Sequence, residues 1–271
     1  MSPIQFEPIG YIETCFKERF GTPRQPSLVP SSWGILRLRP ELNLNAALEG
    51  LEGFSHIWLI FLFHENTNKG VNAKVHPPRL EGKSIGLFAT RSPHRPNPIG
   101  LSAVKLDRIE AGVLYLSGVD LLDGTPILDI KPYLPSSDLI PDATAGWTGS
   151  RPERTLAVRF TDEALDDLKA AFPERYEQAR SAIEEILTLD PRPVFYRGTA
   201  DNPNPYTDVY GFFFDNYNVV YRMEGNIAHV FRIENIDAFL STRRSKKGRR
   251  NDDALASKTC RSPLSSRISK E

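Results

Sequence analysis

The first half of the chain alternates between short apolar stretches and turns that contain Gly or Pro. Apolar or alternating stretches of this length predict β-strands. The predicted strands cover residues 35–38, 54–63, 84–90, 101–109 and 113–119. Glu110-Ala111-Gly112 joins the last two strands as a hairpin, and residues 44–51 predict one short helix. Many short strands with such turns favour a closed barrel or a sandwich, and no Gly-x-Gly-x-x-Gly motif of a Rossmann fold follows any of them.

The pattern changes after about residue 145. Thr161 is expected to cap a helix whose apolar stripe is ended by Pro173. A second helical stripe covers residues 176–187 and stops at Asp190-Pro191. Three strands follow, at residues 209–214, 218–223 and 227–233. The sequence therefore predicts a β-rich domain over residues 1–147, a small α+β domain over residues 148–238 and a tail over residues 239–271.

Composition narrows the class of protein. The chain has 271 residues, of which 40% are hydrophobic, as in a soluble globular protein. Its most apolar stretch, residues 57–63, is far too short to cross a bilayer, and the N-terminus has no signal-peptide pattern. We therefore expect a cytoplasmic protein. Cys15 and Cys260 are far apart, and neither they nor the histidines have the spacing of metal ligands, so no metal site is expected.

The net charge of zero hides an uneven distribution. Residues 241–271 contain ten Lys or Arg and three Asp or Glu, so the rest of the chain carries 24 basic and 31 acidic residues. This basic tail has too few apolar residues to form a core and is expected to be disordered. Tails of this kind either contact nucleic acid or simply increase solubility, and the sequence leaves both open.

Residues 91–102 form the most informative loop, with the sequence Arg-Ser-Pro-His-Arg-Pro-Asn-Pro-Ile-Gly-Leu-Ser. Three prolines restrict the backbone, so its two arginines and its asparagine would be held in place before a ligand binds. Such side chains could bind a carboxylate, a phosphate or a ribose. The alternative is an ordinary surface turn.

Three further loops have a similar character. Residues 23–26 are Pro-Arg-Gln-Pro, His64-Glu65-Asn66 ends the most apolar strand, and Asp123-Gly124-Thr125-Pro126 is typical of a turn. If the strands close a barrel, these loops could meet at one rim. They offer no nucleophile elbow and no metal ligands, so they suit an organic cofactor better than hydrolysis. Methyl transfer fits, because its main requirements are alignment and exclusion of water.

These motifs resemble those of the TsaA/TrmO family, also called YaeB-like. The resemblance rests on residues 54–64, on the loop at residues 90–101 and on residues 123–135, which read Asp-Gly-Thr-Pro-Ile-Leu-Asp-Ile-Lys-Pro-Tyr-Leu-Pro. Residues 23–26 and 190–193 are similar to the longer, bacterial-type members. The resemblance to the family covers roughly residues 6–233.

The resemblance implies an S-adenosylmethionine-dependent methyltransferase on a small closed β-barrel, acting as a homodimer on tRNA. The implied product is N6-methylated threonylcarbamoyl-adenosine at position 37, beside the anticodon, with threonine tRNA as the implied substrate. The positions that match the family's cofactor-binding motifs are Arg24, Gln25, Pro26, His64, Glu65, Arg91, Leu101, Asp123, Gly124, Thr125 and Pro126. In the second domain, the candidates for contact with the tRNA anticodon stem-loop are Arg192, Tyr196, Tyr210 and Arg222.

The chemistry of these side chains suggests individual roles. Arg24 or Arg91 could pair with the methionine carboxylate, Glu65 or Asp123 could bind ribose hydroxyls or the amine, and Leu101 could lie against the adenine. No general base is identified by the sequence. Two other classes remain open: a regulatory or RNA-binding protein that senses S-adenosylmethionine without turnover, and a structural barrel that oligomerises.

Overall fold

The structure is a computed structural model, which describes residues 4–66, 70, 72–77, 80, 82–149, 155–197 and 208–241. The chain divides into two compact units. The first contains Met1–Phe16 and Thr22–Glu153, and the second contains Lys17–Gly21 and Arg154–Glu271. A short segment near the N-terminus therefore belongs to the same unit as the C-terminal half.

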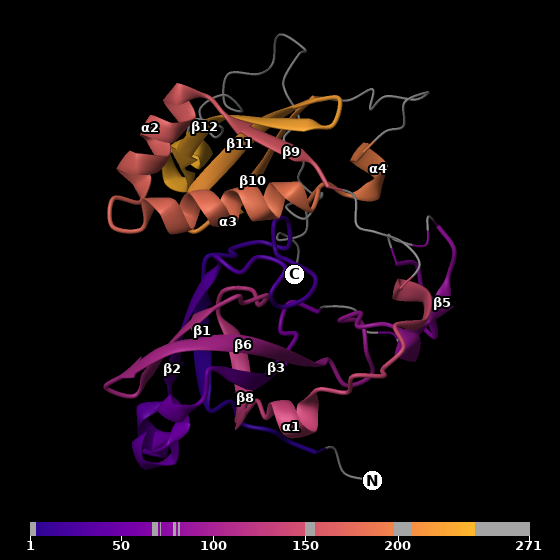
Figure 1. Cartoon of the computed structure of the whole chain (residues 1–271), viewed down its shortest axis with the longest axis vertical. Helices are drawn as coiled ribbons and strands as arrows, with labels where there is room; N and C mark the ends of the chain where they lie inside the picture. Colours follow the sequence, from indigo (N-terminus) through magenta and orange to yellow (C-terminus); the bar gives the residue numbers. More distant parts are fainter. Residues whose placement is uncertain are drawn as a thin grey trace, which may run out of the picture. The chain divides into compact units, whose positions relative to one another are not determined.

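Six antiparallel strands of the first unit close into a barrel in the order β1-β2-β7-β6-β3-β8 (Figure 1). Their bounds are Gly10–Thr14 (β1), Trp33–Leu38 (β2), His56–Leu62 (β3), Ile99–Glu110 (β6), Val113–Ser117 (β7) and Thr125–Pro132 (β8). Alternate side chains along these strands form the core, among them Ile12, Leu36, Ile57, Leu59, Leu114 and Ile127, all fully buried. The closed barrel is thus confirmed, and the sandwich alternative is excluded.

Of the elements predicted in the first unit, the hairpin forms as expected, whereas the strand at residues 84–90 does not. The β6–β7 hairpin is confirmed, and its turn residues Ala111 and Gly112 both have positive φ. Residues 84–90 were expected to form one strand, but only β5 (Ile85–Gly86) is extended, paired with β4 (Lys74–Val75). The 3-10 turn η5 (Leu87–Ala89) replaces the rest, because the Thr90 hydroxyl donates to the Leu87 carbonyl and closes it.

The expected helix at residues 44–51 is also different. It consists of two 3-10 turns, η2 (Leu44–Leu48) and η3 (Leu51–Gly53), separated by Gly50 with φ 85°. A positive φ ends a right-handed helix, which is why the apolar stripe does not continue as one element. The remaining short elements of this unit are η1 (Pro40–Leu42), α1 (Pro135–Asp138) and η6 (Gly146–Thr148).

The second unit is an α+β domain built on a four-stranded sheet of order β10-β11-β12-β9. Its elements are β9 (Ala157–Phe160), α2 (Asp162–Ala171), α3 (Tyr176–Thr188), α4 (Val194–Arg197), β10 (Val209–Phe214), β11 (Tyr217–Glu224) and β12 (Ile227–Asn235). The three predicted strands and both long helices are confirmed. The sequence did not predict β9, a short edge strand that pairs in parallel with β12.

The helices of this unit form for the reasons that the sequence indicated. The Thr161 hydroxyl accepts a hydrogen bond from the Ala164 amide at 3.2 Å and so caps α2. The apolar faces of α2 and α3 are buried, with α2 against β12 and α3 against β9 (Figure 1). Residues 236–241 form a helical turn that includes the first three residues of the predicted tail; residues 242–271 lie outside the described part of the chain.

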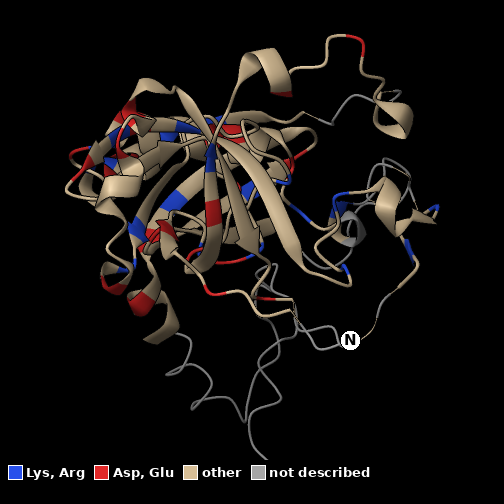
Figure 2. Cartoon of the chain, turned by 90° about the horizontal axis from the view of Figure 1, so that it is seen from below, with Lys and Arg blue, Asp and Glu red and all other residues tan. Residues whose placement is uncertain are grey.

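Charged residues of both signs are interspersed over the described part of the chain (Figure 2). Several exposed basic side chains of the barrel lie within 3 Å of an acidic neighbour, as in the pairs Arg37–Glu13, Lys105–Asp107, Arg108–Glu110 and Lys131–Asp129. A search of the same residues finds no helix with the length and apolar character needed to span a membrane.

Candidate functional site

The proline-rich loop at residues 91–98 connects η5 to β6 and is held by side-chain hydrogen bonds as well as by its prolines. The Asn66 amide donates to the Pro93 carbonyl at 2.9 Å, and its oxygen lies 2.8 Å from His94 Nδ1. Arg95 Nη1 donates to the Thr90 carbonyl at 2.9 Å. Because Asn66 follows β3, it joins two of the predicted loops. Asn66 thus has a positioning role that the sequence did not reveal.

Arg91 and Gln25 come together although 66 residues separate them in the sequence. The Arg91 guanidinium donates to Gln25 Oε1, while the Gln25 amide nitrogen donates to the Arg24 carbonyl at 2.6 Å. Arg91 and Arg24 are exposed, and Gln25 and Pro26 are half-buried. The structure therefore places the loop at residues 23–26 against Arg91. This contact is expected if the predicted loops meet at one rim of the barrel.

The Asp123-Gly124-Thr125-Pro126 segment is the tight turn that the sequence predicted, with Gly124 at φ 73°. Asp123 Oδ1 accepts from the Thr14 amide at 2.8 Å, and the Asp123 amide donates to the Phe16 carbonyl at 2.9 Å. These bonds attach the turn to the end of β1. Asp123 thus has a structural role that the sequence did not indicate, while Gly124 is exposed and an added Cβ would meet nothing within 4 Å.

The remaining cofactor candidates lie on or after the neighbouring strands β3 and β6. His64 and Glu65 follow β3 and are exposed, with His64 Nε2 3.8 Å from Glu65 Oε1. Leu101 lies on β6 opposite Ile60 of β3 and is 54% exposed. An apolar side chain this exposed on a barrel strand is suited to cover a flat, apolar ligand group.

Asp120 is a residue of this region that sequence analysis missed. It follows β7, its Oδ1 is buried, and that oxygen has no hydrogen-bond partner among the described residues. Burial raises the pKa of Asp120 to about 6, although a hydrogen bond from Ser102, its own backbone and the charge of Arg91 act in the opposite direction. The sequence feature that could have identified Asp120 is its position at the end of a predicted strand, three residues before Asp123.

These groups fit S-adenosylmethionine, which carries a carboxylate, an ammonium group, a sulfonium charge and an apolar adenine ring. Arg91 offers a guanidinium for the carboxylate. Leu101 offers an exposed apolar surface for the adenine. In the described residues, no group of three or more His, Cys, Asp or Glu side chains could hold a metal ion.

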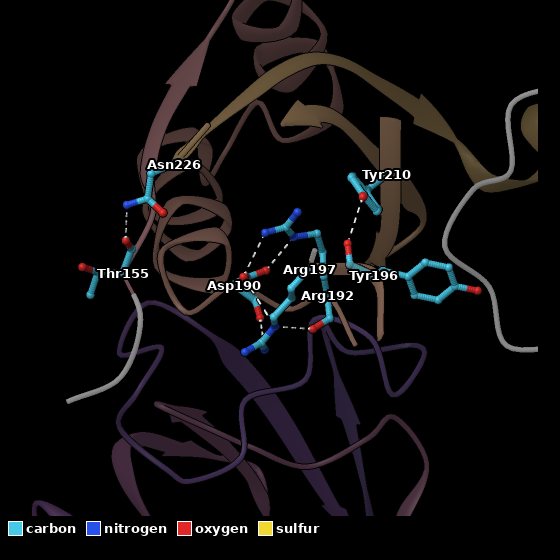
Figure 3. Close-up of polar contacts among 7 residues, drawn as sticks. All are labelled: Thr155, Asp190, Arg192, Tyr196, Arg197, Tyr210 and Asn226. Atoms are coloured by element: carbon cyan, nitrogen blue, oxygen red, sulfur yellow. Dashed lines mark hydrogen bonds and ion pairs between the residues drawn. The ribbon is translucent and has the colours of Figure 1, made fainter. Parts of the chain in front are cut away.

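The four RNA-contact candidates of the second unit divide into two pairs. Arg192 Nε and Nη2 donate to the two carboxylate oxygens of Asp190 at 2.8 and 3.0 Å, and Arg192 also lies over the Tyr210 ring (Figure 3). Arg192 and Tyr210 are 8% and 1% exposed. Each of these two side chains is therefore buried and engaged within the domain, which leaves little surface for the predicted RNA contact.

Tyr196 and Arg222 are the candidates that remain at the surface. The Tyr196 carbonyl accepts from the Tyr210 hydroxyl at 3.2 Å. The Tyr196 ring points away from the Asp190 cluster, which consists of Asp190, Arg192 and Arg197 (Figure 3). Arg222 is half-exposed, with Nε 3.1 Å from Asp208 Oδ2. Arg222 is thus accessible to a partner, and Tyr196 is half-buried.

Fold and site together define a β-barrel protein that presents charged and amide side chains on rigid loops to a small organic cofactor, with an α+β domain appended. Comparison with known proteins identifies the family. Residues 11–139 match the tRNA-methyltransferase O N-terminal domain, and residues 153–236 match the TrmO C-terminal domain. The chain belongs to the tRNA-methyltransferase O family.

Individual relatives support this assignment. The chain is 42% identical over 239 residues to the tRNA (adenine(37)-N6)-methyltransferase of Escherichia coli K12, an alignment that covers 86% of this chain and 99% of the relative. It is 48% identical over 191 residues to the putative S-adenosylmethionine-dependent methyltransferase RcsF of Pseudomonas aeruginosa PAO1, covering 70% and 82% of the two chains. The crystal structure of TrmO from P. aeruginosa superposes with a TM-score of 0.70 at 36% identity, covering 86% and 98%.

Proposed function

We propose that this protein transfers a methyl group from S-adenosylmethionine to N6 of adenine 37 in tRNA. The observation that carries the proposal is the match of both domains to one family of tRNA methyltransferases, together with the cluster of Gln25, Arg91 and Asp120 at one region of the barrel. Threonylcarbamoyl-adenosine is the proposed form of the acceptor, threonine tRNA the proposed tRNA, and the cytoplasm the proposed compartment.

The proposed cofactor site uses the loops that surround this cluster. Arg91 pairs with the methionine carboxylate and Gln25 orients Arg91. Leu101 covers the adenine, and the turn at residues 123–126 offers backbone groups beside the exposed Gly124. Arg24, Pro26, His64 and Glu65 complete the proposed set. When bound, S-adenosylmethionine supplies the methyl group, and the residues of this chain bind it and exclude water.

The second unit is proposed to bind the anticodon stem-loop, as an accessory domain over residues 148–238. Tyr196 offers an aromatic ring for stacking on an unpaired base, and Arg222 offers a guanidinium for a phosphate. Arg222 is held near the surface by Asp208 and by the Phe231 ring, 5.7 Å from its guanidinium carbon. The basic tail at residues 239–271 would add positive charge close to this domain in the sequence.

A homodimer is the proposed assembly, and the outer wall of the barrel supports it. Ile99 and Leu101 lie on β6, which pairs with β3, and both side chains are exposed. Leu139 and Ile140, which follow α1, are more than 60% exposed. Exposed apolar side chains of this kind are typical of an interface. Because Leu101 is also a proposed cofactor residue, a second copy could complete the site.

We expect sedimentation equilibrium to give twice the chain mass of 30.5 kDa. Replacing Leu139 and Ile140 by Asp is expected to shift the protein toward the monomer, because each charge would have to be buried in the interface. Ile4→Asp is the matched control, since Ile4 is 82% exposed and lies outside the barrel strands. A wild-type monomer at micromolar concentration would contradict the proposed assembly.

The proposed reaction is tested by methyl transfer from labelled S-adenosylmethionine to tRNA prepared with and without the threonylcarbamoyl group. We expect label in N6-methylated threonylcarbamoyl-adenosine, and only in the modified tRNA. Transfer to both tRNAs would retain the reaction and reject the proposed acceptor. Cofactor binding without transfer to either tRNA would favour the regulatory alternative, in which the protein senses S-adenosylmethionine without turnover.

A further inference from the structure

Asp120 is a half-buried acid that has no assigned part in cofactor binding. Its Oδ1 is buried and lacks a partner among the described residues of the protein. A buried acceptor without a donor costs free energy, and native proteins rarely retain one without a use for it. The missing donor is therefore expected to arrive with a ligand.

The neighbours of Asp120 place it at the proposed cofactor site. Ser102, on β6 next to Leu101, and the charge of Arg91 both lower the pKa of Asp120. The backbone just before Asp120 is tied to the loop after Pro26, since the Ser27 amide donates to the Gly118 carbonyl at 3.3 Å. Asp120 therefore lies among loops that carry Gln25, Arg91 and Leu101.

The proposed reaction needs a proton acceptor. The N6 nitrogen of the target adenine keeps its lone pair delocalised, and it loses its proton when it gains a methyl group. Two other groups of the loops already have hydrogen-bond partners, since Asp123 accepts from the Thr14 amide and His94 Nδ1 lies 2.8 Å from the Asn66 oxygen. Among the buried side-chain oxygens of the described residues, Asp120 Oδ1 is without a hydrogen-bond partner.

We propose that Asp120 accepts the proton that N6 of the target adenine loses during methyl transfer. The inference rests on the proposed reaction. The N6–H bond breaks and its electron pair stays on nitrogen, the N6–CH₃ bond forms, and the S–CH₃ electron pair passes to sulfur, which becomes a neutral thioether. The proton moves to the Asp120 carboxylate, which later releases it to water.

The electrostatics of the site suit this role. Burial raises the pKa of Asp120 to about 6, while the Ser102 hydrogen bond and the Arg91 charge limit the rise. The carboxylate is thus ionised at neutral pH, yet it is a stronger base than an exposed Asp. General bases work best when their pKa lies near the working pH.

The test compares wild type with Asp120→Asn, which keeps the size of the side chain, and with Asp120→Glu, which keeps the charge. Single-turnover rates are measured at saturating S-adenosylmethionine on a tRNA that the wild type methylates. Asp120→Asn is expected to lower the rate about 100- to 1,000-fold, and Asp120→Glu less. The wild-type rate should rise tenfold per pH unit below about pH 6 and level off above it, and Asp120→Asn should lose this dependence.

Two measurements separate proton transfer from cofactor binding and from folding. By calorimetry, Asp120→Asn should bind S-adenosylmethionine within about twofold of wild type, because the proposed contact is to the acceptor. In the cofactor-free protein, ¹³C-carboxyl NMR should show one carboxyl that titrates near pH 6 and is absent in Asp120→Asn. The variant should also unfold at a temperature no lower than wild type, since it no longer buries a charge.

Three outcomes would overturn the inference. A weakened cofactor affinity with a rate restored at saturating S-adenosylmethionine would make Asp120 a cofactor ligand. An unchanged rate in Asp120→Asn, or a pH profile that persists in it, would remove Asp120 from the reaction while the proposed function stands. A wild type that methylates no tRNA would instead reject the proposed function itself.

Discussion

Arg91→Ala is expected to weaken the binding of S-adenosylmethionine about 10- to 100-fold. A guanidinium that pairs with a carboxylate contributes about 1.5–3 kcal/mol, and every 1.4 kcal/mol corresponds to a factor of ten. Arg91 is already oriented by Gln25, so little side-chain entropy remains to be lost on binding. Titration calorimetry on the purified protein measures the affinity directly and does not depend on tRNA.

Arg37→Ala is the matched control for this experiment. Arg37 is also an exposed arginine of the barrel, but it pairs with Glu13 at 2.8 Å on the strands β1 and β2. Its loss should leave cofactor affinity unchanged, since exposed ion pairs contribute little. Equal affinity in Arg91→Ala and wild type would remove Arg91 from the cofactor site. Removing Arg91 should also raise the pKa of Asp120 further, because the Arg91 charge lowers it.

The second large effect is expected at Asp190, where Asp190→Ala should destabilise the second unit by about 3–5 kcal/mol. Removing one member of a buried ion pair leaves the other charge uncompensated. Asp190 is 1% exposed, binds Arg192 through both oxygens, and lies 3.4 Å from Arg197 Nε (Figure 3). It also has φ 49°, a left-handed conformation that Ala adopts less readily than Asp.

Thermal or urea unfolding of the full chain measures this loss. Asp190→Asn separates the two causes, because Asn tolerates the left-handed backbone but carries no charge. Asp208→Ala is the control, since its pair with Arg222 is exposed and its loss should cost less than about 1 kcal/mol. If Asp190→Ala unfolds like Asp208→Ala, the Asp190 cluster does not stabilise the domain as its geometry indicates.

Periodicity predicted the long elements well because each has a local signal strong enough to decide it. The helix from Asp162 to Ala171 has a Thr cap, an acidic first turn and an apolar face, and it forms where expected. It predicted residues 84–90 poorly, since a stretch so short is decided by one hydrogen bond, from Thr90 to the Leu87 carbonyl. The strand β9 has only four residues, and its pairing with β12 is visible only in three dimensions.

In the candidate site, too, some features were predictable from the sequence and others depend on packing. Pro-Arg-Gln-Pro, the proline-rich loop and the Asp-Gly-Thr-Pro turn are distinctive in sequence, and Arg91 and Gln25 do lie together. Burial, by contrast, is a property of the packed chain. Tyr210 and Arg192 look like RNA-binding residues in the sequence but lie in the core of their domain, whereas Asp120 looks unremarkable in the sequence and holds an unpartnered buried oxygen.

The sequence by itself determined the β-rich first domain, the α+β second domain and the family, because apolar periodicity, turn residues and short motifs are local properties of the chain. Only the tertiary structure decided which polar side chains are accessible and which are already paired. Barrel closure brings Gln25, Arg91, Ser102 and Asp120 from four separate segments into one region. Proximity across such sequence distances, and the desolvation that changes the pKa of Asp120, arise only when the chain packs.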